Sequence, residues 1–456
     1  MSADKSSDIL IIGGGPAGRI AALTARRYYP DKSVLLVQNV AKGVVPCGIP
    51  YMASSLKSPD DNSSPCGSLS NSGVKVLDAD AVALDRAAKT VSFGNGSAAA
   101  YDRLVLACGS TPLIPKVPGA GLKNVFRIYK DLDRLKEMFS ALKAASHITV
   151  LGGGFIGVEM AEELAKAGRK VTLVELLPGL LANSFDPEFG ELATAKLKGL
   201  GVRVITGTAV EAIEGSGCAE SVRLAGGETY ACDAVVLAIG AVPNAGLAAN
   251  AGLDLSRTGA VAVDEYMRTS DPCVFAVGDC AEKKDFFTRR PVSVMLASTA
   301  TAEARVAGSN LFGLKVVREN KGTIAAYSTC VDGLVLASAG LTEAAARREG
   351  FEVVTGVSEG VDRHPAAMPG ASKVKLKLVF SRHSGLLMGG QVYGGVSSGE
   401  LINIVGAAVQ TGMSVTELET LQVATHPWLT SAPTAYPITA AAQDASVKLF
   451  RAMKEN

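Results

Sequence analysis

The sequence predicts an α/β fold with two Rossmann-like nucleotide-binding domains and a C-terminal α+β domain. Two observations support the first part. A glycine-rich loop stands between a short apolar run and a helix-like segment at residues 13–18, and again at residues 152–157. A third observation supports the second part, because strand-like runs precede helical ones from about residue 322 onward. The chain has 456 residues, 48% of them hydrophobic, which is enough for large cores in several domains.

The first loop has the pattern GxGxxG and follows the apolar residues 8–12. Gly13 allows the tight turn, Gly15 lets a pyrophosphate approach the backbone, and Gly18 lets the next helix pack on the strand. The helix predicted at residues 17–29 then offers its free N-terminal N–H groups to phosphate. Strand, loop and helix together predict a dinucleotide site.

The second strand of this unit, residues 33–38, ends at Gln38, where such units usually carry an acid. The amide of Gln38 can still hydrogen-bond a ribose hydroxyl, but without the charge. Farther along, the alternation of residues 74–76 and 90–93 predicts a β-hairpin. Residues 101–110 predict a strand that ends in a turn of small residues.

A solitary cysteine, Cys47, stands between Pro46 and Pro50 and beside Gly48. Proline and glycine fix the backbone on either side, so the thiol is presented rather than merely buried. A helix predicted to start after Pro50 lowers the pKa of this thiol and favours the thiolate. Cys47 is therefore the candidate redox residue.

Prolines within residues 112–118 mark a crossover to the second unit. That unit repeats the pattern, with a strand at residues 147–151, a helix at 158–167 and a strand at 170–175. The last of these strands ends at Glu175, the position of a ribose-binding acid. Because a carboxylate there repels a 2′-phosphate, the sequence favours NADH over NADPH.

The second unit closes with a strand at residues 234–240, which echoes residues 104–109. Beyond it, the apolar residues 274–277 end in Gly278 and Asp279. The glycine admits a close ligand, and the carboxylate can accept a hydrogen bond from a polyol hydroxyl.

The part of the chain after residue 322 predicts an antiparallel sheet with helices. The strands are expected at residues 327–339, 351–357, 372–380 and 385–392. The helices are expected at residues 398–412 and 415–421. The first of these helices is apolar on most faces. It is short for a membrane span, so it is predicted to be a buried or interface helix.

Charge and cysteine content exclude several classes of function. The formal net charge of +1 does not favour nucleic acid or an anionic membrane, and no apolar run approaches the ~18 residues that a membrane helix needs. Only four His are present, without Cys/His metal spacing, so no metal is predicted. The eight cysteines are scattered and no signal peptide is visible, which predicts a cytoplasmic protein.

Taken in order, these features resemble the FAD-dependent pyridine nucleotide–disulfide oxidoreductases over essentially the whole chain. The resemblance implies an FAD domain (residues 1–115 and 250–321) split by an NAD(P)H domain (116–249), and a C-terminal domain (322–456) that forms a homodimer. It implies an FAD site at Gly13, Gly15, Pro16, Ala17, Gly18, Gln38, Cys47, Ala107, Gly109, Gly278 and Asp279. It implies an NADH site at Gly152, Gly154, Phe155, Ile156, Gly157, Glu159, Glu175 and Gly240.

Cys47 decides the branch of the family that the chain resembles. The next cysteine is Cys66, so the pair of cysteines four residues apart that marks one branch is missing. The chain looks like the single-cysteine branch, which holds coenzyme A disulfide reductases, persulfide reductases, NADH oxidases and NADH peroxidases. Residues 47–51 are most similar to the coenzyme A disulfide and persulfide reductases. Peroxidases and water-forming oxidases of this branch carry a His in the first loop; Pro16 stands there instead and cannot transfer a proton.

The resemblance also implies a mechanism. NADH reduces the flavin on one face, where the ring of Phe155 moves aside and Glu159 lies near the nicotinamide, and Cys47 receives the electrons on the other face. The acceptor is a low-molecular-weight disulfide, persulfide or polysulfide, with coenzyme A derivatives favoured. His426 and Tyr436 are the candidates to protonate the released thiol across the dimer. The alternative for His426 is that it holds an interface loop.

Other functions stay open at this stage. An NADH oxidase would keep the cofactors and reduce oxygen. An NADH-dependent reductase of a small electron-transfer protein needs a charged docking face, whereas the 45 basic and 44 acidic residues are nearly balanced. A flavoprotein that only binds or senses the nucleotide is disfavoured by the complete second loop.

Overall fold

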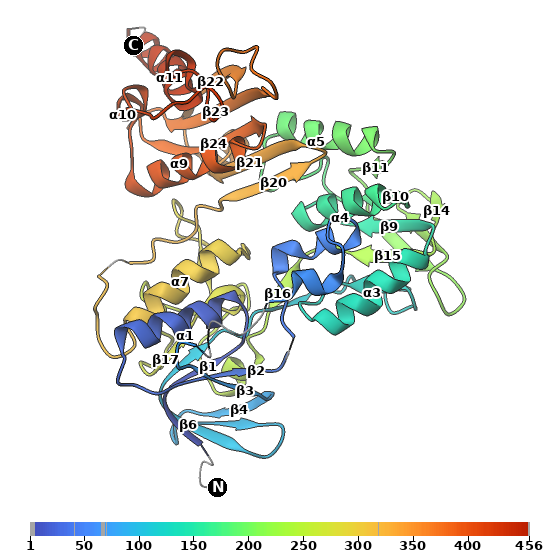
Figure 1. Cartoon of the computed structure of the whole chain (residues 1–456), viewed down its shortest axis with the longest axis vertical. Coiled ribbons are helices and arrows are strands. Elements are labelled where there is room, and N and C mark those ends of the chain that lie inside the picture. The colour runs from blue at the N-terminus through green and yellow to red at the C-terminus, as the bar shows by residue number, and fades with distance from the viewer. Residues whose placement is uncertain (1–4, 41, 65–68, 70, 318, 455–456) are drawn as a thin grey trace.

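The computed structural model describes residues 5–40, 42–64, 69, 71–317 and 319–454. The chain forms two units built on parallel sheets and a C-terminal domain that stands above them in Figure 1. Cys66, the nearest cysteine after Cys47 in the sequence, lies outside the described residues.

The first unit contains a seven-stranded sheet in the order β3-β2-β1-β6-β5-β4, with β17 beside β6. Its strands are β1 (Lys5–Ile12), β2 (Val34–Gln38), β3 (Lys75–Asp78), β4 (Ala81–Asp85), β5 (Thr90–Phe93), β6 (Ala98–Leu106) and β17 (Val274–Ala276). Residues 9–12 of β1 and the strands β2 and β17 are buried on both faces, so they are mostly apolar, with many Ile, Leu and Val. Helices α1 (Pro16–Tyr28) and α7 (Ala297–Ser309) lie side by side against it (Figure 1).

The predicted hairpin between residues 74–76 and 90–93 is wrong. β3 instead extends the parallel sheet, since Gln38 of β2 aligns with Asp78 of β3. The hairpin partner of β5 is β4, whose residues are mostly exposed and carry a weak hydrophobic pattern. Alternation marks a strand, but it does not say which strand lies next to it.

The second unit repeats this plan on a five-stranded parallel sheet in the order β11-β10-β9-β15-β8. Its strands are β8 (Val125–Arg127), β9 (His147–Leu151), β10 (Lys170–Val174), β11 (Arg203–Ile205) and β15 (Ala234–Leu237). An antiparallel meander adds β12 (Val210–Glu214), β13 (Ser221–Leu224) and β14 (Thr229–Ala231). The helices are α3 (Leu132–Ala144), α4 (Phe155–Lys166) and α5 (Pro187–Gly199), whereas the short α6 (Gly246–Asn250) packs against β4 of the first unit.

The two connections between these units run side by side. β7 (Ser110–Pro112) leads out of the first sheet, β16 (Ala241–Pro243) leads out of the second, and the two pair antiparallel. Two short 3₁₀ helices, η1 (Pro46–Gly48) and η2 (Pro50–Ala53), also bridge the units. η2 lies against α4 (Figure 1), and this contact places the Cys47 segment of the first unit next to the second unit.

The C-terminal domain is an antiparallel five-stranded sheet in the order β20-β21-β24-β23-β22. Its strands are β20 (Tyr327–Val331), β21 (Leu334–Gly340), β22 (Val353–Val361), β23 (Lys373–Ser381) and β24 (Leu387–Gly394), and its helices are α8 (Glu343–Arg348), α9 (Ser398–Thr411), α10 (Val415–Glu419) and α11 (Pro437–Lys454). α9 packs against β21 and β24, α11 against β22 and β23, and β20 against α4. The predicted fold class is confirmed.

The remaining short elements are η3 (Pro59–Asn62), η4 (Gly278–Cys280), β18 (Lys283–Lys284), β19 (Pro291–Val292) and η5 (Pro433–Ala435). η4 follows β17 at the carboxyl edge of the first sheet, the edge where open α/β sheets bind their ligands. Among the described residues, no helix is both long enough and apolar enough to cross a membrane.

Candidate active site

The first glycine loop packs closely against the sheet and leaves one side open. Gly13 has a φ of +121°, and a Cβ there would clash with the carbonyl oxygen of Ala107. A Cβ at Gly18 would clash with the backbone of Gly13, so α1 meets the strand without a side chain between them. Around Gly15 the space is open, and α1 begins there without a side-chain cap. The N–H groups at the start of α1 thus face a space that suits an anion.

The second glycine loop has the same construction. A Cβ at Gly157 would clash with the backbone of Gly152, while the space around Gly154 is open at the start of α4. A cavity of about 260 Å³ lies beside this loop and is lined by Gly153, Gly154, Phe155, Glu175, Leu177, Gly179, Leu181, Ala182, Asn183 and Ser184. The carboxylate of Glu175 accepts hydrogen bonds from the backbone N–H groups of Gly153 and, at 2.6 Å, Leu177. An acceptor is therefore fixed at the edge of this cavity.

Gln38 occupies the corresponding position in the first unit and is buried. Its Nε2 donates a hydrogen bond to Oδ1 of Asp78 at 2.9 Å, and its Oε1 lies close to Gly14 in the loop. Asp78 thus orients the amide so that the acceptor atom faces the loop. Gln38 therefore still supplies a hydrogen-bond acceptor in place of the usual acid, and the carboxylate of Asp78 lies on the neighbouring strand β3.

Asp279 lies where the first unit meets the crossover strand β7. Its Oδ2 accepts hydrogen bonds from Ser110 Oγ and Lys130 Nζ, each at 2.7 Å. Burial by itself would raise the pKa of Asp279, but Lys130 and Ser110 hold it below its usual value. Gly278, with φ of +74°, packs against Ala17 of α1, so the Asp279 turn lies next to the first glycine loop.

Two buried side chains hold the Gly278 turn. Glu303 of α7 accepts a hydrogen bond from the N–H of Gly278 at 2.9 Å, and Lys283 donates to the carbonyl of Gly278 at 2.6 Å. Gly109, with φ of +70°, leads from the first sheet into β7 near the same place. A cavity of about 230 Å³ adjoins this turn and is lined by Pro243, Thr258, Ala260, Asp279, Ala281, Lys283, Val292, Ser293, Val294 and Met295.

Cys47 stands in η1 with its side chain open to solvent on one side. Partial burial and the nearby carboxylate of Glu159 raise the pKa of the thiol, and the ammonium of Lys130 opposes them. The expectation of a lowered thiol pKa is therefore wrong. The segment after Pro50 is a four-residue 3₁₀ helix, so it has little dipole to offset burial and a neighbouring negative charge.

Glu159 is a buried carboxyl on α4. Burial is the main cause that raises its pKa to about 7, Glu162 and Glu163 on the same helix add to the rise, and a hydrogen bond from Thr329 opposes it. Thr329 Oγ1 of β20 lies 2.7 Å from Glu159 Oε1. A carboxyl that titrates near neutral pH beside a thiol is typical of a reactive site.

Phe155, the first residue of α4, is covered by an aromatic ring from the C-terminal domain. The rings of Phe155 and Tyr327 stack with centroids 4.8 Å apart and an angle of 20° between their planes. Burial raises the pKa of the Tyr327 hydroxyl, which is hydrogen-bonded to Ser184 in the wall of the cavity beside the second loop. Entry of a ring-shaped ligand beside α4 must therefore displace this stack or pass along it.

The remaining residues predicted for the site lie either near the second glycine loop or in the C-terminal domain. Ile156 is half-buried in the first turn of α4, and Gly240 is exposed after β15, at the same sheet edge as the second loop. His426 is exposed in the loop after α10, where its Nδ1 accepts the N–H of Trp428 at 3.3 Å, and Tyr436 is buried in the core of the C-terminal domain. A role for either at Cys47 requires a partner subunit and stays a prediction.

The sequence analysis missed Lys130, Ser110 and Tyr327. Lys130 stands between β8 and α3 without a motif around it, and only the fold brings it to Asp279 and near Cys47. Ser110 could have been found, because it directly follows the strand that ends in Gly109. Tyr327 was read only as the start of a strand, and its position over Phe155 depends on how β20 lies on α4.

Comparison with known proteins gives matches to two stretches of the chain. Residues 7–304 match the family described as pyridine nucleotide-disulphide oxidoreductase, and residues 327–436 match its dimerisation domain. An NAD(P)H coenzyme A polysulfide/persulfide reductase of Pyrococcus horikoshii is 33% identical over 404 residues, which cover 86% of this chain and 89% of the relative. An NADH oxidase of Methanocaldococcus jannaschii is 30% identical, with 96% and 99% covered.

A solved structure of an NAD-dependent persulfide reductase from A. fulgidus is similar, with a TM-score of 0.89 and 31% identity over 96% of this chain and 83% of that one. The open helix starts, the fixed acceptors at Gln38 and Glu175 and the Asp279 turn fit FAD and a nicotinamide nucleotide. The protein is an NAD(P)H-dependent flavoprotein oxidoreductase that uses FAD. The chain belongs to the pyridine nucleotide-disulphide oxidoreductase family.

Proposed function

We propose that this enzyme oxidises NADH and reduces a low-molecular-weight disulfide, persulfide or polysulfide, with coenzyme A derivatives favoured and Cys47 as the redox sulfur. One observation carries the proposal. The Cys47 thiol is open to solvent and within electrostatic reach of both Glu159 on α4 and Lys130, which is bound to Asp279. These contacts connect the thiol electrostatically to both nucleotide-binding units, which supports a role in passing electrons to a substrate.

In this proposal the domains divide as the sequence predicts: residues 1–115 and 250–321 bind FAD, residues 116–249 bind NADH, and residues 322–456 form the dimer. The first glycine loop and Asp279 hold FAD, whose pyrophosphate takes the open space at Gly15. The second loop and Glu175 hold NADH. Bound FAD supplies the two-electron link between NADH and the cysteine. Glu175 favours NADH because its carboxylate repels a 2′-phosphate.

The chemistry at Cys47 is balanced thiol–disulfide exchange. The thiolate attacks one sulfur of a disulfide RSSR, the S–S bond breaks, and RS⁻ leaves and is protonated. Two electrons that originate from NADH then cleave the mixed disulfide and release the second thiol. The net change is NADH + H⁺ + RSSR → NAD⁺ + 2 RSH. A persulfide RSSH gives RSH and H₂S by the same steps.

The proton for the leaving thiolate comes, in this proposal, from a homodimer partner. The C-terminal domain exposes the apolar side chains of Trp428, Leu429 and Phe450, which favours a protein-covered surface there. His426 is exposed, so its imidazole, whose Nδ1 accepts the N–H of Trp428, is accessible to a partner's Cys47. Tyr436 is the second candidate, although its hydroxyl is buried in this chain and its pKa is raised by burial.

Reduction of oxygen is the second candidate function, because an NADH oxidase covers 96% of this chain at 30% identity. Pro16 argues against peroxide chemistry in this enzyme. It is the first residue of α1, where it offers no proton to a cysteine sulfenic acid.

The test is an anaerobic screen of NADH consumption with coenzyme A disulfide, coenzyme A persulfide, glutathione disulfide and polysulfide, followed by oxygen. We expect a coenzyme A compound to give the highest kcat/KM. Background rates on every sulfur compound, with rapid oxygen consumption, would replace the proposal by the oxidase function.

Two glycine variants test the FAD site. In Gly15→Ala the new methyl group clashes with nothing in the protein, but it fills the space assigned to the pyrophosphate. We therefore expect the melting temperature of the flavin-free protein to be unchanged. The affinity for FAD should fall by about tenfold or more. Gly13→Ala is the contrast: its methyl group clashes with Ala107, so the protein itself is destabilised. Flavin fluorescence titration and thermal denaturation measure the two effects. Unchanged FAD affinity in Gly15→Ala would remove FAD from this loop.

A further inference from the structure

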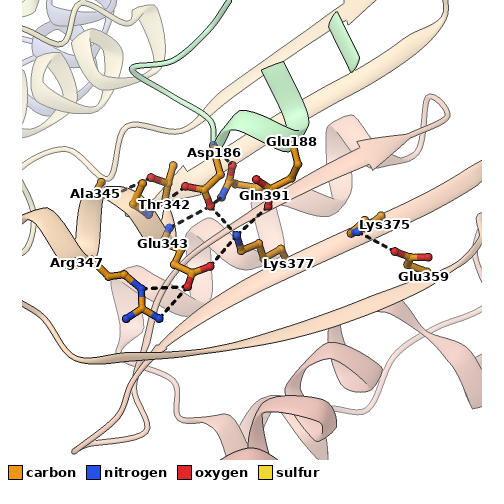
Figure 2. Close-up of polar contacts among 11 residues, drawn as sticks. Asp186, Glu188, Thr342, Glu343, Ala345, Arg347, Glu359, Lys375, Lys377 and Gln391 are labelled. Carbon is orange, nitrogen blue, oxygen red and sulfur yellow. Dashed lines mark hydrogen bonds and ion pairs between the residues drawn. The ribbon is translucent and has the colours of Figure 1, made fainter. Parts of the chain in front are cut away.

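A buried carboxylate, Asp186, joins the second unit to the C-terminal domain just before α5 (Figure 2). Its Oδ2 accepts hydrogen bonds from Lys377 Nζ of β23 at 2.9 Å and from Gln391 Nε2 of β24 at 2.6 Å. The backbone N–H of Asp186 donates to Oε1 of Gln391 at 2.7 Å. On the other oxygen, Oδ1 accepts the N–H of Ala344 in α8 at 3.1 Å. One residue thus binds three separate elements of the C-terminal domain.

The centre of this cluster is shielded from solvent, and Glu188 and Glu343 lie at its more exposed edge. Asp186 is 2% exposed, Gln391 0% and Lys377 8%. Besides Asp186, the ammonium of Lys377 contacts Glu188 at 2.9 Å and Glu343 at 2.8 Å, so its three protons face three carboxylates. Burial by itself would lower the pKa of Lys377, but these carboxylates raise it above its usual value. The ammonium stays charged, and the cluster has one well-defined arrangement.

This cluster lies at one end of a wall of the cavity beside the second loop. Residues 181–184 line that cavity together with Gly153 and Glu175, and Asp186 follows two positions later. The wall is held at its other end by the N–H of Leu181, which donates to the carbonyl of Gly153 at 2.8 Å. Leu181 has φ of +57°, an unfavourable conformation for a residue with a branched side chain. A segment of this kind keeps its shape only when both ends are fixed.

The C-terminal domain touches the same wall at a second point. Tyr327 of β20 is hydrogen-bonded to Ser184, and its ring stacks on Phe155. The cavity assigned to NADH therefore has a wall whose position is set by residues of the domain that forms the dimer.

We propose that Asp186 is a positioning residue for NADH: through Lys377 and Gln391 it uses the C-terminal domain to hold residues 181–184 in the shape that accepts the nucleotide. The inference rests on the proposed function, which places NADH at the second loop. It adds that the C-terminal domain acts on NADH binding within its own chain, in addition to forming the dimer.

The test uses Asp186→Asn in the full-length, FAD-loaded enzyme. Asparagine keeps the size of the side chain and leaves Lys377 with Glu188 and Glu343, so the fold is retained. Flavin reduction is followed anaerobically by stopped-flow absorbance over a range of NADH concentrations, with no sulfur compound present. We expect the Kd for NADH to rise about tenfold while the limiting rate of reduction stays within about twofold, because a binding wall is loosened and the reacting groups are not touched.

Lys375→Met is the matched control. Lys375 lies on the same strand two residues from Lys377, but its partner Glu359, 2.8 Å away, is exposed (Figure 2). This variant should reproduce the wild-type Kd, whereas Lys377→Met should match or exceed the effect of Asp186→Asn. A lower melting temperature in Asp186→Asn together with the wild-type Kd would reduce the cluster to a structural contact and overturn the proposal. A wild-type enzyme that NADH does not reduce would overturn the proposed function as well.

Discussion

Replacing Cys47 with serine is expected to abolish turnover of every low-molecular-weight sulfur acceptor while NADH still reduces the flavin. A serine hydroxyl is not ionised near neutral pH and cannot form the mixed disulfide, so kcat/KM for the sulfur acceptor should fall by about a thousandfold or more. NADH binds at the second loop in our proposal, and Cys47 does not line the cavity there. Steady-state rates with coenzyme A disulfide and anaerobic flavin reduction measure the two halves separately.

Cys218→Ser is the control for this prediction, because Cys218 is a half-buried free thiol at the antiparallel meander of the second unit. It should leave both half-reactions unchanged. Sulfur turnover that survives in Cys47→Ser would exclude Cys47 as the redox residue. Fast oxygen consumption by the wild type that is lost in Cys47→Ser would favour the oxidase function.

Replacing Glu175 with arginine is expected to reverse the preference between the two nicotinamide nucleotides. The carboxylate of Glu175 is fixed at the cavity edge by the N–H of Leu177, where it can accept from a ribose hydroxyl. Loss of a charged hydrogen bond costs about 3 kcal/mol, so kcat/KM for NADH should fall about a hundredfold. The guanidinium pairs with a 2′-phosphate, so kcat/KM for NADPH should rise.

The control for this variant is Glu191→Arg, which makes the same change of charge at an exposed position of α5 away from the lining of the cavity. It should leave both kcat/KM values near those of the wild type, which excludes a general effect of net charge. Equal use of NADH and NADPH by the unmodified enzyme would show that Glu175 does not discriminate between them.

The candidate site illustrates which features are readable before the structure is known. Both glycine loops were identified because the turn, the close helix contact and the open phosphate space each require a missing Cβ at a fixed spacing. Glu175 and Asp279 were predicted because they follow strands whose carboxyl ends lie at the ligand edge of their sheets. The environment of Cys47 was judged wrongly. Its flanking residues are visible in the sequence, but the pKa of the thiol is raised by burial in the fold and by Glu159, which is far away along the chain.

By itself, the sequence determined the repeated strand, loop and helix units, the solitary cysteine and the family, because these depend on local backbone requirements and on short spacings. Only the tertiary structure decided that Lys130 meets Asp279, that Tyr327 covers Phe155 and that Lys377 meets Asp186. Pairs of this kind join residues from separate units, and their free energy depends on mutual distance and shared burial. The distance between two such residues and their burial do not depend on the residues next to them in the sequence. The sequence pattern therefore predicted the glycine loops but not the long-range contacts that hold them.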